Sequence, residues 1–357
     1  MKSDVSTGAS FSRFQRSARQ RVGVNVQQLG AQSLVSKSGE FPLKLEPSIE
    51  AIDPIGWMVE ARDDVTAMLF QHGAILFRNF GIEDANRFQQ FVEAFSPNTI
   101  DYIERAAPRT KVAQKVFTST EFSPDHPIPL HHEMSYSHNW PAYIFFYCSK
   151  PPSSGGATPI ARETNVLPKI TPKVRERFES HGVMYVRNYS PSLDVSWQDA
   201  FQTDDPRKVA EYCTQFDIRY EWIDAEHLRT RQIRQAIAAH PHTGEVVWFN
   251  HAHLFHVSNL DFDSRNYLLE SLGMDRLPRN AFYGDGSPIE DTVLDEIRGL
   301  YNSTAVEFEW LRGDVMLVDN FLAAHGRAPF KGERQILVAM SDLFVNPTFA
   351  TLGTAFV

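Results

Sequence analysis

Short apolar runs broken by proline and glycine are the feature that most restricts how this chain can fold. Five runs have the length and the β-branched or aromatic content of strands. The 357 residues include 26 Phe, 21 Pro and 19 Gly, which favours many short strands and turns over long helices. The five runs span residues 74–80, 143–149, 183–189, 315–318 and 335–344.

Helical periodicity is confined to a few segments. Residues 56–73 and 82–95 carry apolar side chains at helical spacing, and Gly73 is a suitable stop for the first helix. Residues 288–301 form a third amphipathic pattern. Residues 190–240 are polar and helical in pattern, which is typical of an insertion that decorates a strand-rich core and acts as a lid.

These patterns predict a single mostly β domain with peripheral helices, an α+β protein folded as an antiparallel jelly roll, over residues 41–357. Within it, residues 225–237 are predicted to be helical and residues 305–310 to form a strand. Residues 1–40 are predicted to be a flexible N-terminal arm. Because residues 1–22 are rich in Ser and Arg, an organelle transit peptide is the alternative for that part.

Charge and cysteine content exclude some classes of protein. A net charge of −9 and a pI near 5.8 disfavour a nucleic-acid partner held by phosphate contacts. Cys148 and Cys213 are too few for a disulfide scaffold, and we expect both to be buried in a protein of a reducing compartment. No apolar run reaches the length of a membrane span. We therefore predict a cytoplasmic protein of undetermined oligomeric state, without a nucleic-acid or membrane partner.

The segment HHEMSY, residues 131–136, offers two metal ligands from one short piece of backbone. His131 and Glu133 are two positions apart and would lie on the same side of an extended segment. His325 is the best candidate for a third ligand. Two histidines and one carboxylate on one face of a metal leave other positions open, as in non-heme Fe(II) oxygenases. For any one of these histidines, a hydrogen-bonded core residue remains the alternative.

A second histidine-rich segment, HAHLFH at residues 251–256, is a rival metal site. It contains no carboxylate between its histidines. The candidate ligands there are His251, His253 and His256, joined by His240 or His242.

Four motifs in combination make the chain resemble a known family. They are H-x-E at residues 131–133, GGATP ending at Pro159, D-N-x4-H-G-R around His325, and G-x-R ending at Arg334. From about Phe41 to Phe344 the chain resembles the Fe(II)- and 2-oxoglutarate-dependent dioxygenases of the taurine dioxygenase and clavaminate synthase superfamily. The resemblance implies a double-stranded β-helix, an Fe(II) cofactor, and 2-oxoglutarate and O2 as co-substrates.

The resemblance also implies roles for individual residues. His131, Glu133 and His325 would be the catalytic iron ligands, with His132 facing away from the metal. Arg334 would clamp the distal carboxylate of 2-oxoglutarate, since a guanidinium fork suits a carboxylate. Thr158 would donate a hydrogen bond to the same carboxylate. Arg327 would either position the co-substrate or brace the site. Asp319 and Asn320 would shape the loop before His325 or support the site from behind the ligands.

Two positions narrow the expected reaction. The taurine enzyme has a second arginine that grips the substrate's sulfonate, and here the corresponding residue is Val338. An apolar residue cannot hold an anion, so the substrate must be anchored elsewhere. Related halogenases replace the carboxylate ligand with a small residue, so Glu133 predicts oxygen insertion.

The nearest resemblance is to syringomycin-type hydroxylases, which act on amino acids tethered to carrier proteins, and it rests on GDG at 284–286, WFN at 248–250 and HGRxPFxGxR. It implies hydroxylation of an unactivated C–H bond of an amino acid, free or carrier-tethered, in secondary metabolism, with release of succinate and CO2. The predicted substrate-pocket residues are Trp248, Asn250 and Ser135. The basic residues predicted to meet an acidic carrier, or to form a solvated helix face, are Arg229, Arg231 and Arg234.

Three alternatives stay open at this point. The same iron site would also support desaturation or cyclisation. A jelly-roll metalloenzyme of another type would act without O2 and 2-oxoglutarate. A non-catalytic binding module would bind its ligand without a metal.

Overall fold

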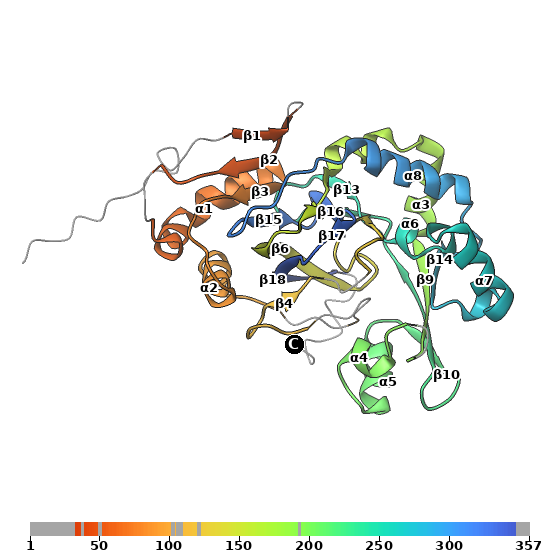
Figure 1. Cartoon of the computed structure of the whole chain (residues 1–357). Helices are drawn as coiled ribbons and strands as arrows, with labels where there is room; N and C mark the ends of the chain where they lie inside the picture. Colours follow the sequence, from red (N-terminus) through yellow and green to blue (C-terminus); the bar gives the residue numbers. More distant parts are fainter. Residues whose placement is uncertain are drawn as a thin grey trace, which may run out of the picture.

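The computed structural model contains a large twisted sheet, a small sheet beside it, and a lobe built on a third sheet (Figure 1). Within the described residues, the strand order of the large sheet is β1-β2-β3-β15-β6-β18-β4. Its strands are β1 (Ser33–Ser36), β2 (Gly39–Leu45), β3 (Ala74–Phe77), β4 (Phe117–Thr118), β6 (Asn139–Lys150), β15 (Val315–Asp319) and β18 (Gln335–Val345). The structure describes residues 33–36, 39–48, 52–100, 104, 110–119, 123–191 and 194–347.

Both faces of the large sheet are buried, which explains why its strands are continuous apolar runs. In β6, Phe145 and Tyr147 face one apolar cluster, whereas Ile144, Phe146 and Cys148 face another. The first cluster is covered by α1 (Pro54–His72) and α2 (Ala85–Phe95). The second lies between the large sheet and the small sheet.

Helix α1 begins two residues earlier than its apolar pattern suggests. The Asp53 carboxylate caps the helix by accepting hydrogen bonds from the backbone N–H groups of Ile55 and Gly56. Pro54 fits the first turn because its missing N–H would have no helical partner there. Gly73 ends the helix in the left-handed conformation with φ of 79°, as the sequence predicts.

The small sheet has the order β5-β16-β8, and it supplies the side chains of greatest chemical interest. It is antiparallel, and β16 is its central strand, paired with β5 on one side and β8 on the other. Its strands are β5 (Ile128–His131), β8 (Ile160–Arg162) and β16 (Ala323–Arg327).

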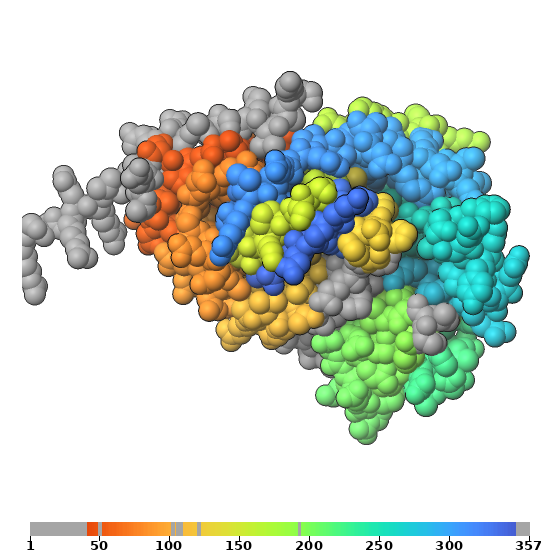
Figure 2. All heavy atoms as spheres, viewed as in Figure 1, coloured from red at the N-terminus to blue at the C-terminus, as the bar shows by residue number. Residues whose placement is uncertain are grey.

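The third sheet carries the lobe, with the order β10-β11-β9-β14. The lobe projects from the body of the molecule in the space-filling view (Figure 2, green). Short helices close its inner side around a separate apolar cluster. Its elements are β9 (Val183–Tyr189), α4 (Trp197–Phe201), α5 (Pro206–Gln215), β10 (Arg219–Trp222), β11 (Leu228–Arg234) and β14 (Arg279–Tyr283).

The lobe confirms one part of the prediction that residues 190–240 are helical, since α4 and α5 lie in that range, and corrects another part. Residues 225–237 were predicted to form a helix, but β11 occupies most of that range and pairs with β9 and β10. On the inner face of β11, Gln232 donates to the carboxylate of Glu104 at 3.2 Å, and Thr230 is also buried. Because these inward positions are polar, the period-two apolar alternation of a strand is absent from the sequence.

Two other predictions are corrected by the structure. The predicted arm over residues 1–40 extends too far, since β1 and the start of β2 lie within it; its remaining residues lie outside the described part of the chain. Residues 305–310 were predicted to form a strand. They are extended but form only the isolated bridge between Val306 and Ile160.

The remaining elements lie in the chain between the strands of these sheets. Helix α8 packs near β5 and β8, and the pair β17-β7 adjoins the loop before β18. No helix among the described residues is long and apolar enough to cross a membrane. These elements are β7 (Ser154–Gly155), α3 (Pro172–His181), β12 (Ile237–Ala239), β13 (Val246–Trp248), α6 (Ala252–Phe255), α7 (Phe262–Leu272), α8 (Asp291–Thr304) and β17 (Phe330–Lys331).

Candidate metal centre and co-substrate pocket

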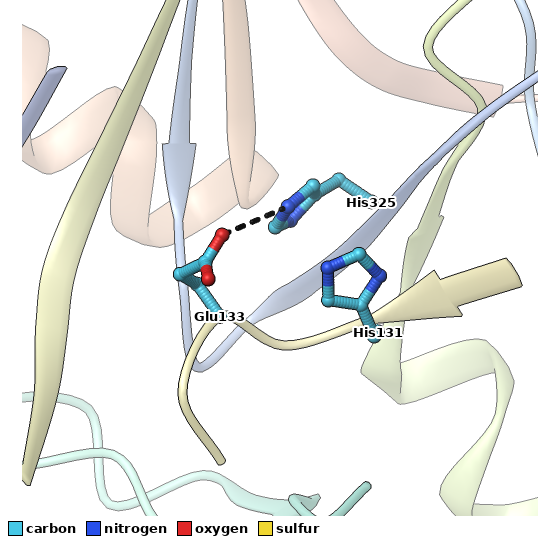
Figure 3. A group of neighbouring side chains, drawn as sticks. All are labelled: His131, Glu133 and His325. Atoms are coloured by element: carbon cyan, nitrogen blue, oxygen red, sulfur yellow. Dashed lines mark ion pairs between the residues drawn. The ribbon is translucent and has the colours of Figure 1, made fainter. Parts of the chain in front are cut away.

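His131 and Glu133 converge with His325, which lies far away in the sequence, on one point (Figure 3). The antiparallel pairing of β16 with β5 places His325 directly opposite His131. One ligand atom from each of the three side chains lies within 4.8 Å of the other two. The Nε2 atom of His325 is 3.9 Å from Oε2 of Glu133. Among the described residues, this is the only group of three potential ligands placed to hold a metal ion.

Glu133 reaches this point by a turn, and not by the strand alternation that the sequence suggested. Strand β5 ends at His131, and residues 133–136 form a turn in which Met134 has φ of 58°. The side chain of Asn320 fixes the backbone of Glu133 from both sides. Its Oδ1 accepts from the Glu133 N–H at 2.8 Å, and its Nδ2 donates to the Glu133 carbonyl at 3.0 Å.

Asp319 shapes the same loop, as the sequence predicted for both Asp319 and Asn320. Its Oδ1 accepts from the backbone N–H groups of Phe321 and Leu322. Its Oδ2 lies 3.0 Å from Nε2 of His240. The turn that leads into β16, and therefore to His325, is held by side chains as well as by the backbone.

His132 faces away from the metal centre, as predicted. Its Nδ1 lies 2.6 Å from the carbonyl oxygen of Asn320, and its Nε2 lies 3.0 Å from Oε1 of Glu163. Each ring nitrogen therefore has an oxygen atom within hydrogen-bond distance. Glu163 also accepts from the Tyr301 hydroxyl at 2.9 Å and from the Trp248 backbone N–H at 3.2 Å. The result is a buried, hydrogen-bonded pair directly behind the ligand-bearing turn.

Arg334 and Thr158 lie beside the three candidate ligands in one pocket. The Arg334 guanidinium donates to the Gly156 carbonyl at 2.9 Å and to Thr158 Oγ1 at 3.4 Å. Burial, together with the nearby charge of Arg327, lowers the pKa of Arg334 to about 10. Among the described residues, no carboxylate forms an ion pair with it, so the pocket holds a partly buried cation suited to an anionic ligand. The pocket is lined by Ser119, Ile128, His131, Glu133, Phe146, Thr158, His325, Gly326, Arg327, Arg334, Ile336 and Val338.

Arg327 lines the pocket and also braces its wall. One guanidinium nitrogen donates to the carbonyl oxygens of Ser123 at 2.5 Å and His126 at 2.9 Å. Burial lowers the pKa of Arg327. Arg327 is a second positive charge in the pocket, beside Arg334, and it adds to the attraction for an anion. Its hydrogen bonds hold the segment that precedes β5.

Trp248, Asn250 and Ser135 do not line the pocket of the candidate metal ligands, and their contact with a substrate stays a prediction. Trp248 is fully buried against Phe178 in the apolar core, with ring centroids 4.9 Å apart. The Asn250 side chain bonds the backbone of Ala236. The Ser135 hydroxyl lies 2.8 Å from Nδ1 of His251. In the structure these three side chains pack in the core or form hydrogen bonds within the chain.

The rival metal site in HAHLFH is not formed. Each histidine has a different partner: His251 contacts Ser135, His253 bonds the Leu130 carbonyl at 2.7 Å, and His256 lies 2.9 Å from the Ser258 hydroxyl. Burial lowers the pKa of His253 to about 3. The His251 ring packs edge-on against His131 at 5.2 Å, so the segment supports the metal centre from the side.

Two residues of the site were missed from the sequence. Phe146 lines the pocket and packs against His325 at 5.1 Å; the alternation within 143–149 was a usable signal for its inward direction. The indole N–H of Trp310 donates to Thr158 Oγ1 at 3.0 Å. Nothing in the spacing of the sequence connects Trp310 with Thr158, which lies far away in the chain.

Comparison with known proteins defines the class. Residues 44–340 match the taurine catabolism dioxygenase TauD, TfdA family. The chain belongs to this family. It is a non-heme iron dioxygenase that depends on 2-oxoglutarate, with Fe(II) as cofactor and O2 as the second co-substrate.

Individual relatives agree with this assignment. The chain is 42% identical to the dapdiamide synthesis protein DdaC of Enterobacter agglomerans, over 78% of this chain and 84% of the relative. It is 32% identical to a clavaminate synthase-like protein of Arabidopsis thaliana, over 77% of this chain and 83% of the relative. The crystal structure of PvcB from Pseudomonas aeruginosa covers 86% of this chain and 89% of its own, at 16% identity and a TM-score of 0.48. That score is too low to add to the assignment.

Proposed function

We propose that this dioxygenase hydroxylates an unactivated C–H bond of an amino acid or amino-acid-derived substrate, free or tethered to a carrier protein, in secondary metabolism. Succinate and CO2 are the co-products. The observation that carries the proposal is one pocket that contains two histidines, one carboxylate and the partly buried guanidinium of Arg334. We also infer that the large and small sheets are the two halves of a double-stranded β-helix.

The donor set fits Fe(II). Two imidazole nitrogens and one carboxylate oxygen within 4.8 Å of one another are the ligands of the facial triad, which leaves positions for a co-substrate and O2. We assign His131, Glu133 and His325 as these ligands. Retention of Glu133 leaves no ligand position vacant for chloride, which favours oxygen insertion over halogenation.

The pocket beside the ligands fits 2-oxoglutarate. Arg334 offers a guanidinium without a carboxylate partner among the described residues, and Thr158 offers a hydroxyl next to it. A charge-assisted bond to a carboxylate in a buried site is stronger than one between neutral groups. We assign both residues to the distal carboxylate, and Arg327 to the electrostatic attraction of the co-substrate.

The protein's own contribution to the reaction is placement. When Fe(II) is bound, it supplies activation of O2, with one oxygen atom going to succinate and the other to the substrate. His131, Glu133 and His325 would hold the metal, and the hydrogen bonds of Asn320 and of the His132–Glu163 pair position the turn that carries the ligands. Phe146 and Val338 give the pocket an apolar wall that excludes water.

Two features bear on the substrate. Val338 lies in the pocket wall, and its apolar side chain offers no cation for a sulfonate. The name of the DdaC relative refers to dapdiamide synthesis, which supports a role in making a metabolite. Of the three arginines proposed to meet a carrier protein, all lie on β11 and not on a helix. Arg231 is exposed, whereas Arg234 is buried and bonds the Phe216 carbonyl, so Arg231 alone is well placed for such contact.

A panel of free and carrier-bound amino acids tests the proposal. We expect one member to stimulate succinate release well above the substrate-free rate and to gain one oxygen atom by mass spectrometry. Loss of two hydrogens instead would indicate desaturation or cyclisation. Activity on any substrate in the absence of both O2 and 2-oxoglutarate would contradict the proposed reaction.

Cytoplasmic location remains a prediction. Both cysteines, Cys148 and Cys213, are buried free thiols, as expected from the sequence.

A further inference from the structure

The hydroxyl of Thr158 has more partners than its expected role requires. It is buried, and its oxygen accepts hydrogen bonds from Trp310 Nε1 at 3.0 Å and from Arg334 Nη2 at 3.4 Å. A hydroxyl has two lone pairs and one proton. With both lone pairs engaged, its proton is left for a third partner.

That third direction is toward the pocket. Thr158 and Arg334 line the pocket together with the candidate metal ligands, whereas Trp310 does not line it and lies behind Thr158. An indole N–H is a donor only, so Trp310 cannot accept the proton of Thr158. Arg334 likewise carries no acceptor. Both neighbours therefore force the hydroxyl to donate elsewhere.

Trp310 is held firmly enough to impose this direction. The backbone on both sides of it is bonded: Arg78 donates to the Glu309 carbonyl at 2.8 Å, and Leu311 N–H donates to Asp314 Oδ2 at 2.9 Å. Arg78 and Asp314 form an ion pair at 2.7 Å that closes this loop. The indole ring packs against Phe308 with centroids 4.7 Å apart.

We propose that Trp310 is a positioning residue for co-substrate selection: by donating to Thr158 Oγ1, it turns the Thr158 proton toward the distal carboxylate of 2-oxoglutarate. This inference rests on the proposed function of Thr158 and Arg334. In the absence of the indole N–H, the hydroxyl is free to rotate. The co-substrate then loses part of one hydrogen bond, and only at its distal end.

The test compares Trp310→Phe with Trp140→Phe as a matched control. Trp140 belongs to the same apolar cluster, and its buried indole N–H has no hydrogen-bond partner in the described part of the chain. Each protein is loaded with Fe(II) without O2 and titrated with 2-oxoglutarate and with 2-oxobutanoate, which lacks the distal carboxylate. Binding is followed by visible absorption, and Fe(II) affinity is measured separately.

We expect Trp310→Phe to weaken 2-oxoglutarate binding by roughly 3- to 10-fold, the effect of one modest hydrogen bond. Binding of 2-oxobutanoate and Fe(II) should stay unchanged, which a general loss of structure would not allow. Trp140→Phe should match the wild type for both acids. Thr158→Val should weaken 2-oxoglutarate binding as well, and the double variant should be no weaker than Thr158→Val alone.

Equal loss of affinity for both acids in Trp310→Phe, or unchanged 2-oxoglutarate affinity, would overturn the inference. So would effects of Trp310→Phe and Thr158→Val that multiply in the double variant. If Trp310→Phe does not fold, Thr158→Val decides: a ratio of the affinities for 2-oxoglutarate and 2-oxobutanoate equal to that of the wild type would overturn it, since Arg334 alone would then account for the preference. Failure of the wild type to bind 2-oxoglutarate is a different result, since it would remove the proposed function itself.

Discussion

The His131→Ala variant is expected to lose Fe(II) binding and turnover almost completely. Partners that merely support a metal ligand are worth about 10- to 100-fold in metal affinity or activity, so removal of a ligand should cost more than 100-fold. His131 stands opposite His325 across the β5–β16 pair, and no other described histidine is placed to replace it. Calorimetric titration of the apoprotein with Fe(II) under anaerobic conditions measures the loss.

The matched control for His131→Ala is His227→Ala. His227 is partly exposed in the lobe and contacts Asp224, away from the pocket. This variant should bind Fe(II) with wild-type affinity. Wild-type affinity in His131→Ala, with the protein folded, would remove His131 from the ligand set.

The second large effect is on stability, in Glu163→Ala. Glu163 and His132 are fully buried and bonded to each other at 3.0 Å, and Tyr301 and Trp248 also donate to Glu163. Removing the carboxylate leaves three buried groups without their partner, and each such group costs about 1–3 kcal/mol, so the total should be at least about 3 kcal/mol. We expect the free energy of unfolding, measured by chemical denaturation of the apoprotein, to fall by that amount.

Glu270→Ala is the control for this experiment, because Glu270 is exposed on α7. Its effect should stay within about 0.5 kcal/mol. A denaturation midpoint for Glu163→Ala equal to that of the wild type would contradict the role given to the pair. The same reasoning applies to His132→Ala, which should retain Fe(II) when folded but be much less stable. Substitution of His131 is thus expected to abolish Fe(II) binding, whereas substitution of His132 is expected to lower the free energy of unfolding.

Helices with one apolar face and strands buried on both faces were predictable from the sequence. Helix α1 lies close to its predicted range because its apolar residues recur at helical spacing, and strands β3 and β18 do so because they are continuous apolar runs. Strand β11 was missed because its inner face is polar and bonds the buried Glu104. Residues 305–310 show the opposite failure, since they alternate like a strand but have no continuous partner.

The site was predictable where its chemistry depends on residue type and spacing. The motifs pointed to His131, Glu133, His325, Thr158 and Arg334, and the structure brings all five into one pocket. Local sequence could not show that Trp310 would meet Thr158, because that contact depends on long-range packing. Trp248 is buried in the core, and its predicted contact with a substrate is not tested by the structure.

The central claim is that this pocket holds Fe(II) and 2-oxoglutarate together, and anaerobic titration tests it most directly. Apoprotein saturated with 2-oxoglutarate is titrated with Fe(II) while the visible absorption is recorded. We predict a weak metal-to-ligand band that saturates at one Fe(II) per chain and does not form in His131→Ala. Absence of the band in the folded wild-type protein, or an equal band in His131→Ala, would contradict the account.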